Sequence, residues 1–104
     1  MEEMILVYVT NPSKEKAKEL ANHLLEKRLV ACVNIFAGHS MYWWEGDIAK
    51  EEEFVFIAKT VEDNFDAVKY AIMDFSDYQI PCVIKVPVTA NQQFVQWLRS
   101  EIRT

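Results

Sequence analysis

Residues 39–47 read HSMYWWEGD and place three consecutive aromatic residues directly before a tight-turn signal. That signal is the pair Glu45-Gly46, a weaker form of the Asn-Gly turn that joins two antiparallel strands. An extended run over residues 31–44 leads into the turn, and a second extended run over residues 48–59 leads away from it. The stretch therefore predicts a long β-hairpin whose tip carries large rings.

This hairpin is too long to run straight within its own domain. At about 3.3 Å per residue a straight strand over residues 31–44 spans roughly 46 Å, whereas a globule of this size is roughly 34 Å across. The tip must overhang the domain, or the strand must bend at Gly38. Because side chains alternate, Tyr42 and Trp44 point to one side of this arm and Trp43 to the other.

The three rings need a cover. Together they carry roughly 450–750 Å² of surface, which reaches or exceeds the largest apolar patch usual on a monomer, about 300–600 Å². The arm could fold back on its own sheet, or it could pair with neighbouring copies in a closed ring that also hides the sheet edges. We favour the second interpretation, in which Tyr42, Trp43 and Trp44 form a contact between copies.

The other segments alternate between strand and helix patterns. We expect strands over residues 4–10 and 82–88, and helices over residues 13–28, from Thr60 to about residue 75, and over residues 91–102. Thr60 with Asp63 three positions on resembles a capping box, and the last helix should bury Phe94, Leu98 and Trp97. The order predicts one α+β domain, residues 1–104, built as a ferredoxin-like split βαβ sandwich with an antiparallel sheet and helices on one face.

Composition limits the partners. The net charge of −5 leaves no basic stripe for phosphates, so a nucleic-acid partner is excluded. The amino-terminal segment is acidic with only a strand-length apolar run, and no stretch has membrane-spanning length, so we expect neither a secretory signal nor a membrane partner. The two isolated cysteines favour reduced thiols in a cytoplasmic protein.

Several motifs, spread over nearly the whole chain, resemble the CutA family of divalent-cation-tolerance proteins. They are VYVTNP (residues 7–12), KRLVACVNI (27–35), MYWWEGDI (41–48), FIAKT (56–60), Tyr78-x-x-Pro81 and VPV (86–88). The resemblance implies a very stable ferredoxin-like homotrimer in which the YWW arms join neighbouring sheets. It also implies a role in metal-ion tolerance, with copper or other divalent ions as proposed ligands and no established catalytic reaction.

This chain departs from the family at its metal-type positions. Many members carry a histidine where Ser76 stands, a glutamate where Gln79 stands and another glutamate where Cys82 stands. Some carry a cysteine where Val9 stands. Imidazole and thiolate ligands, which suit copper or zinc, are therefore missing at those places.

Two residues remain as candidate metal ligands. Cys82 could supply a soft ligand at a boundary between subunits, although a small buried apolar role also suits it. His39 on the arm could bind metal across the ring, or could be a simple exposed polar residue. Copper or another divalent cation is the cofactor these residues would hold.

A second function class is small-ligand sensing. Asn34, Lys59 and Tyr78 could enter a cleft between subunits and hold an anion or small metabolite, with metal binding incidental. Each also has a structural explanation, namely a backbone-satisfied amide, a surface lysine and a loop anchor. Catalysis lacks support, because no glycine-rich phosphate loop and no histidine placed beside a nucleophile are recognisable. We therefore predict a binding protein and not an enzyme.

Overall fold

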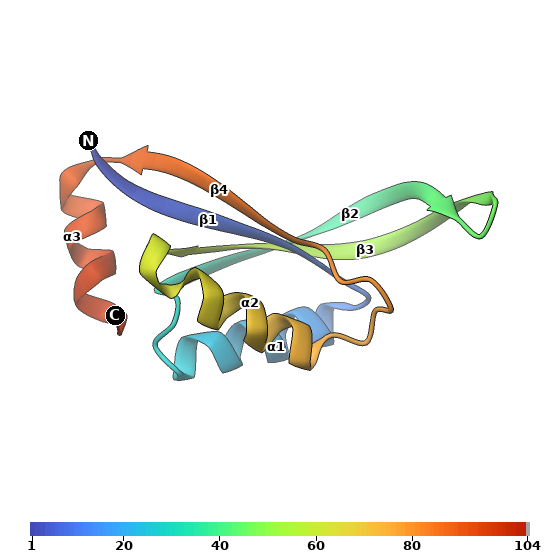
Figure 1. The fold of residues 1–104 in the computed structure, drawn as a ribbon, viewed down its shortest axis with the longest axis horizontal. Coiled ribbons are helices and arrows are strands. Elements are labelled where there is room, and N and C mark those ends of the chain that lie inside the picture. The colour runs from blue at the N-terminus through green and yellow to red at the C-terminus, as the bar shows by residue number, and fades with distance from the viewer. Residues whose placement is uncertain (104) are drawn as a thin grey trace.

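The computed structural model describes residues 1–103 and confirms the predicted class of fold, an α+β protein with one four-stranded antiparallel sheet. The sheet order is β2-β3-β1-β4, so β2 and β4 form its edges (Figure 1). The strands are β1 Glu2–Asn11, β2 Cys32–Trp44, β3 Asp47–Thr60 and β4 Val83–Ala90. The helices are α1 Lys14–Glu26, α2 Phe65–Phe75 and α3 Gln92–Glu101, with a 3-10 turn at Glu62–Asn64.

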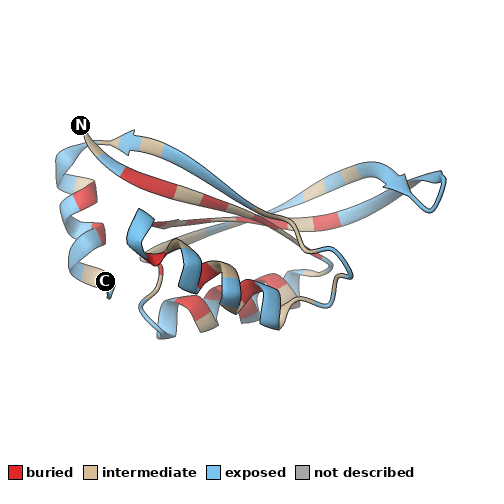
Figure 2. Cartoon of the chain, in the orientation of Figure 1, coloured by how far each residue is buried: buried red, intermediate tan, exposed pale blue. Residues whose placement is uncertain are grey.

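The main core lies between the sheet and the pair of helices α1 and α2, which lie on one side of it (Figures 1 and 2). Alternate residues of β1 point into this core, as the period of a strand requires. They meet the buried face of α1, which consists of Ala17, Leu20, Ala21 and Leu24. The Ser13 side chain caps the start of α1, because it accepts a hydrogen bond from the Lys16 backbone N–H at 3.1 Å.

A second, smaller core forms where α3 packs at the end of the sheet near residue 1. Its buried members are Met4, Val61, Val95, Leu98 and Ile102. The prediction for this helix was therefore only partly right: Leu98 is buried, but Phe94 is half-buried and Trp97 stays 45% exposed, while Val95 takes the central place. None of the helices in residues 1–103 is long and apolar enough to cross a membrane.

The predicted start of the second helix is wrong. Thr60 is the last residue of β3, and its hydroxyl donates a hydrogen bond to the Leu29 carbonyl oxygen at 2.7 Å instead of capping a helix. The 3-10 turn follows, and α2 begins only after Asn64, whose side-chain amide also donates to Leu29 at 3.1 Å. Two polar side chains thus hold the loop after α1 against the end of β3.

The hairpin of β2 and β3 projects from the rest of the molecule as an arm (Figure 1). The chain measures 46 × 25 × 21 Å along its principal axes, which agrees with the predicted overhang. The predicted turn is confirmed, because Glu45 has φ 50° and Gly46 has φ 86°. Positive φ at both central residues belongs to a type I′ turn, whose twist matches that of the flanking strands.

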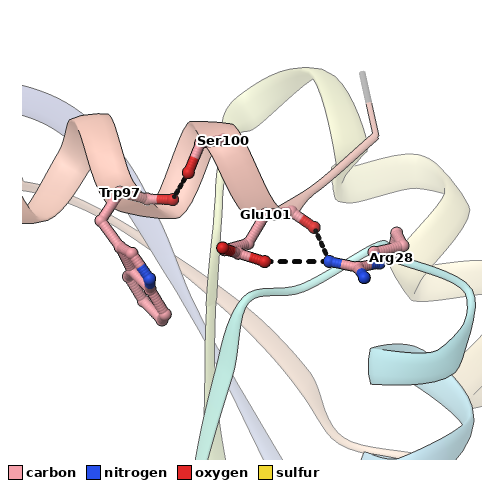
Figure 3. A network of polar contacts seen from close by, with 4 residues as sticks. All are labelled: Arg28, Trp97, Ser100 and Glu101. Atoms are coloured by element: carbon pink, nitrogen blue, oxygen red, sulfur yellow. Dashed lines mark hydrogen bonds and ion pairs between the residues drawn. The ribbon is translucent and has the colours of Figure 1, made fainter.

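The end of α3 is tied to the turn after α1 (Figure 3). The Arg28 guanidinium donates from Nη1 to the Glu101 carboxylate at 2.9 Å and to the Glu101 carbonyl oxygen at 3.0 Å. The Arg103 backbone N–H donates to the Arg28 carbonyl oxygen at 2.8 Å. Arg28 adopts the left-handed conformation, φ 60°, that ends α1 and directs the chain toward β2.

Candidate functional site

A groove of about 700 Å³ lies where the arm leaves the sheet. One wall is the arm itself, and the other is the loop between α2 and β4. The arm contributes His39, Ser40, Met41, Tyr42, Trp44, Ala49, Glu51 and Glu53, and the rest of the lining is Thr10, Asp77, Tyr78, Gln79, Ile80 and Cys82. Five of the residues selected from the sequence therefore line one groove: His39, Tyr42, Trp44, Tyr78 and Cys82.

The strand register divides the arm into two faces. Tyr42 pairs with Ala49 and both line the groove, whereas Trp43 pairs with Ile48 and neither does. The predicted alternation of the three rings is thus what separates them. Trp43 is 73% exposed and Ile48 is 53% exposed, compared with 38% for Trp44. The face away from the groove is the barer one.

Glu53 is the most unusual residue of the groove. It pairs with Gly38 across the ladder, is only 7% exposed, and accepts a hydrogen bond from the Tyr78 hydroxyl through Oε2. No other side chain of the described residues donates to it, and it has no enclosed atom lacking a partner, so its second oxygen remains open to the groove. A carboxylate this buried ordinarily has a cationic partner.

The electrostatics of the groove favour cations. Glu51, Glu53 and Asp77 line it, while no lysine or arginine does. Asp77 is partly neutralised from outside by Lys16, whose Nζ lies 3.2 Å from its carboxylate. The two glutamates have no such ion pair among the described residues, so the groove carries net negative charge.

The negative charge contributes to raised pKa values of two tyrosine side chains in the groove. Burial, and then the hydrogen bond to Glu53, raise the pKa of Tyr78 well above its ordinary value. The hydrogen bond to Glu51 is the main reason that the pKa of Tyr42 is raised. Both rings therefore stay protonated at neutral pH and donate toward carboxylates.

Replacing Tyr78 by phenylalanine should lower the free energy of unfolding by about 1–3 kcal/mol, because a buried carboxylate loses its hydrogen-bond donor. Urea denaturation at one fixed protein concentration measures this loss. Tyr70→Phe is the matched control, since that ring is 62% exposed and its hydroxyl has no hydrogen bond among the described residues. Equal stability of the two variants would contradict the importance of the Tyr78 contact.

Cys82 and His39 both border the groove, as a metal site there would require. Burial, and then the nearby Glu53 carboxylate, raise the pKa of the Cys82 thiol. Both cysteines are free. Within residues 1–103, however, no three His, Cys, Asp or Glu side chains converge closely enough to hold a metal ion.

The raised pKa of Cys82 has a measurable consequence. Its alkylation rate by iodoacetamide should reach half of its maximum at a higher pH than that of an ordinary exposed cysteine thiol, because the pKa of Cys82 is raised. Glu53→Gln removes the second cause of the shift and should lower that midpoint, whereas Glu52→Gln on the opposite face of the arm should not. Peptide mass spectrometry across a pH series gives the rates. Because thiolate is the ligand form, soft-metal binding through Cys82 should strengthen as pH rises.

The three residues predicted for a small-ligand cleft do not come together within one chain. Asn34 pairs with Ile57 and Lys59 with Cys32, while Tyr78 contacts Glu53. Glu53 and Lys59 are six residues apart on one strand, or about 20 Å. The Lys59 ammonium lies 5.5 Å from the centre of the Phe94 ring instead. A cleft using all three would need a neighbouring copy, and it stays a prediction.

The two groove glutamates were not selected from the sequence. Residues 51–53 read EEE, a run typical of a solvated stretch. Their pairing with β2 distinguishes them: Glu53 pairs with Gly38 and Glu51 with Ser40, while Glu52 pairs with His39 and does not line the groove. Small residues opposite two of the three glutamates leave room for those side chains on the groove face.

Comparison with known proteins gives a consistent result. The sequence model of CutA1 divalent ion tolerance protein matches residues 5–101. The divalent-cation tolerance protein CutA of Archaeoglobus fulgidus is 40% identical over 93 residues, covering 88% of this chain and 91% of the relative. The CutA of Pyrococcus horikoshii is 37% identical over 101 residues, covering 96% and 99%.

Solved structures agree with these sequence relatives. The crystal structure of Pyrococcus horikoshii CutA1 has a TM-score of 0.94 at 35% identity and covers 97% of this chain and 100% of its own. A structure described as the periplasmic divalent cation tolerance protein CutA of Archaeoglobus fulgidus has a TM-score of 0.93 at 36% identity, covering 98% and 100%. The names of these proteins carry no enzymatic activity.

Proposed function

Since this chain belongs to the CutA1 divalent ion tolerance protein family, we propose that it supports tolerance of divalent metal ions by binding them, without catalysis. The observation that carries the proposal is the acidic groove, which holds two glutamates without an ion pair among residues 1–103 and is bordered by a thiol and an imidazole. Carboxylate oxygens suit divalent ions in general, and Cys82 with His39 would bias the site toward copper or zinc.

The metal site would be completed by other copies of the chain. One chain does not bring three ligands together among its described residues, so the remaining ligands must come from a neighbour or from water. We propose that the neighbour is a second copy in a closed homotrimer. Metal affinity and assembly are then coupled, because an ion held by two copies stabilises the contact between them.

Two features support the homotrimer. The sheet has two unpaired edges, β2 and β4, and pairing one edge with the other edge of the next copy is a head-to-tail contact that can close into a ring. The arm also presents Trp43, with Met41 and Ile48 beside it, at 73%, 67% and 53% exposure. Tyr42 and Trp44 would lie at the edge of the same contact between copies.

Native mass spectrometry under reducing conditions, with and without copper or zinc, tests the proposal because it reads copy number and bound ions together. We expect a trimer that takes up one ion per copy and loses it when Cys82→Ser and Glu53→Gln are combined. Cys32→Ser with Glu52→Gln is the control of equal charge and composition, and it should keep the ions. A trimer that stays free of metal would overturn metal binding and favour the second candidate, a trimer that senses small metabolites.

The compartment is a separate question. We propose the cytoplasm, because the two free thiols, one bordering the groove, persist in a reducing compartment. Fractionation of the source cells, followed by detection of the protein, checks this placement. Recovery in an oxidising compartment would overturn it; the structure of the Archaeoglobus fulgidus protein is described as periplasmic.

A further inference from the structure

We propose that the groove between α1 and α2 docks an acidic amphipathic helix of a partner protein. This surface, called the helical groove below, lies among the helices that cover one side of the sheet (Figure 1). It shares no lining residue with the groove at the arm, and the proposed contacts between copies do not use it. The proposal therefore goes beyond metal binding and does not depend on it.

The first argument is the shape of the helical groove, which has a volume of about 730 Å³. Its lining comes from both helices and from the segments that follow α1 and α3: His23, Lys27, Leu29, Ala67, Ala71, Asp74, Phe75 and Arg103. Ala67 and Ala71 are one helical turn apart on α2 and leave room for side chains of a partner. Leu29 and Phe75 are half-buried and add apolar surface, and the Phe75 ring stacks on His23 with centroids 5.7 Å apart. A third helix packs on such a pair by laying its ridge of side chains between them.

The second argument is charge. Lys27 and Arg103 carry positive charge into the helical groove, and His23 adds a ring N–H donor, whereas Asp74 is its single acidic residue. None of the three basic residues has an ion pair among residues 1–103. The chain as a whole has a net charge of −5, so this basic groove differs in sign from the molecule around it. It therefore complements a partner that carries Asp and Glu.

These two features together indicate the form of the partner. An amphipathic helix presents apolar residues three and four positions apart, and acidic residues beside that stripe would meet Lys27 and Arg103 at the edges of the groove. The 11 residues of α2 extend about 16 Å, so about three turns of the partner would cover the groove. A contact this short buries less than about 1,200 Å², which is typical of transient complexes.

An anionic membrane fits this face less well than an acidic helix. Asp74 lines the helical groove, and Asp66 is exposed next to Ala67 on the same helix. A flat lipid surface would approach these carboxylates together with the basic residues, and the like charges would repel. A helix can place its acidic residues beside the basic ones alone.

The test is fluorescence anisotropy of a labelled synthetic peptide with the full chain in its native assembly. The peptide is a helix of about 15 residues with alanine and leucine on one stripe and glutamate on both sides of it. One control peptide has lysine in place of every glutamate, and another has the same residues in scrambled order. We expect the acidic helix to bind roughly tenfold more tightly than either control. Nonspecific attraction to a protein of charge −5 would favour the lysine peptide, so the expected order is the reverse of that background.

A pair of double variants tests the charges. Lys27→Glu with Arg103→Glu should weaken binding of the acidic peptide roughly tenfold. Lys18→Glu with Arg99→Glu makes the same charge change at exposed positions outside the helical groove and should leave binding nearly unchanged. Equal effects of the two double variants would overturn the proposal, because the peptide would then respond only to the net charge of the protein.

A second pair of variants tests the shape without changing charge. Ala67→Trp places a large ring in the helical groove and should abolish binding, whereas Met73→Trp on the same helix, outside the groove, should not. Both positions are exposed, so both variants should fold, and circular dichroism checks this. Unchanged binding to a folded Ala67→Trp variant would overturn the proposed location.

NMR spectra of the same titration show where the peptide binds. The backbone amide signals of Ala67 and Ala71 should shift, and that of Trp43 on the arm should not. Shifts confined to the arm, or equal binding of the acidic and lysine peptides, would overturn the proposal. Retention on phosphatidylserine vesicles without peptide binding would also overturn it and assign the groove to a lipid surface. The variant that combines Cys82→Ser with Glu53→Gln should lose metal and still bind the peptide, so each proposal can fail without the other.

Discussion

Replacing Trp43 by glutamate is expected to convert the proposed homotrimer into monomers. The ring is 73% exposed in the single chain and lies on the face of the arm away from the groove, paired with Ile48. Covering a ring of about 150–250 Å² is worth about 4–6 kcal/mol at 25 cal/mol per Å², and each contact of a ring-shaped assembly would lose it. A buried glutamate without a partner adds a further cost.

Sedimentation velocity at several protein concentrations measures this change. Tyr70→Glu is the matched control, because Tyr70 is a large aromatic residue that is 62% exposed on α2, far from the arm. It should leave the assembly intact. An unchanged assembly in the Trp43 variant would refute a contact between copies built on this face of the arm.

Replacing Leu24 by alanine should lower the free energy of unfolding by about 2–5 kcal/mol. Leu24 is completely buried in α1 and packs in the main core between the helices and the sheet. The substitution removes apolar surface and leaves a cavity, and both effects destabilise the folded state. Because α1 covers the face of the sheet opposite the groove, the assembly and cation binding of the folded fraction should be unaffected.

Leu25→Ala is a control one residue away on the same helix. Leu25 is 37% exposed, so the same chemical change should cost well below 1 kcal/mol of stability. Urea denaturation of both variants at equal concentration gives the comparison. Similar losses would mean that Leu25 is covered in the assembly, which would place the outer surface of α1 in a contact between copies.

The architecture was predictable because local signals agree with it. The turn at Glu45-Gly46, the strand periodicity on both sides and the apolar stripe of α1 each point to the observed element. These signals act over a few residues, so they can be recognised without knowing what the chain packs against. Their order along the chain then leaves few arrangements for one sheet and two covering helices.

The start of α2 could not be predicted for the opposite reason. Thr60 and Asp63 have the spacing of a capping box, yet Thr60 contacts Leu29, which lies 31 residues earlier. A contact across that separation is decided by tertiary packing, and here it outweighs the local capping preference. Val61 is buried in the second core and also holds the end of β3 in position. The 3-10 turn therefore comes next, and α2 begins only after it.

The candidate site was predictable in its residue types but not in its pairing. Tyr78, Cys82 and His39 were selected for their chemistry, and all three border the groove. The partner of Tyr78 was missed because it is Glu53, one of three identical neighbours in the sequence. Only the register opposite Gly38 shows which of the three glutamates is buried, and register is a property of the paired strands and not of either strand alone.

The alternation of the arm also has an evolutionary consequence. Ser40, Tyr42 and Trp44 of β2 line the groove, whereas Trp43 between them lies on the barer face, so neighbouring residues of one segment determine the groove lining and the outer face of the arm. Substitutions can therefore change the groove lining or the outer face of the arm while leaving the other unchanged. Lengthening each strand by two residues would keep the side chains on their present faces of the arm. Lengthening each strand by one residue would move the side chains beyond the insertion to the opposite face. Homologous arms should therefore vary in length by pairs of residues in each strand.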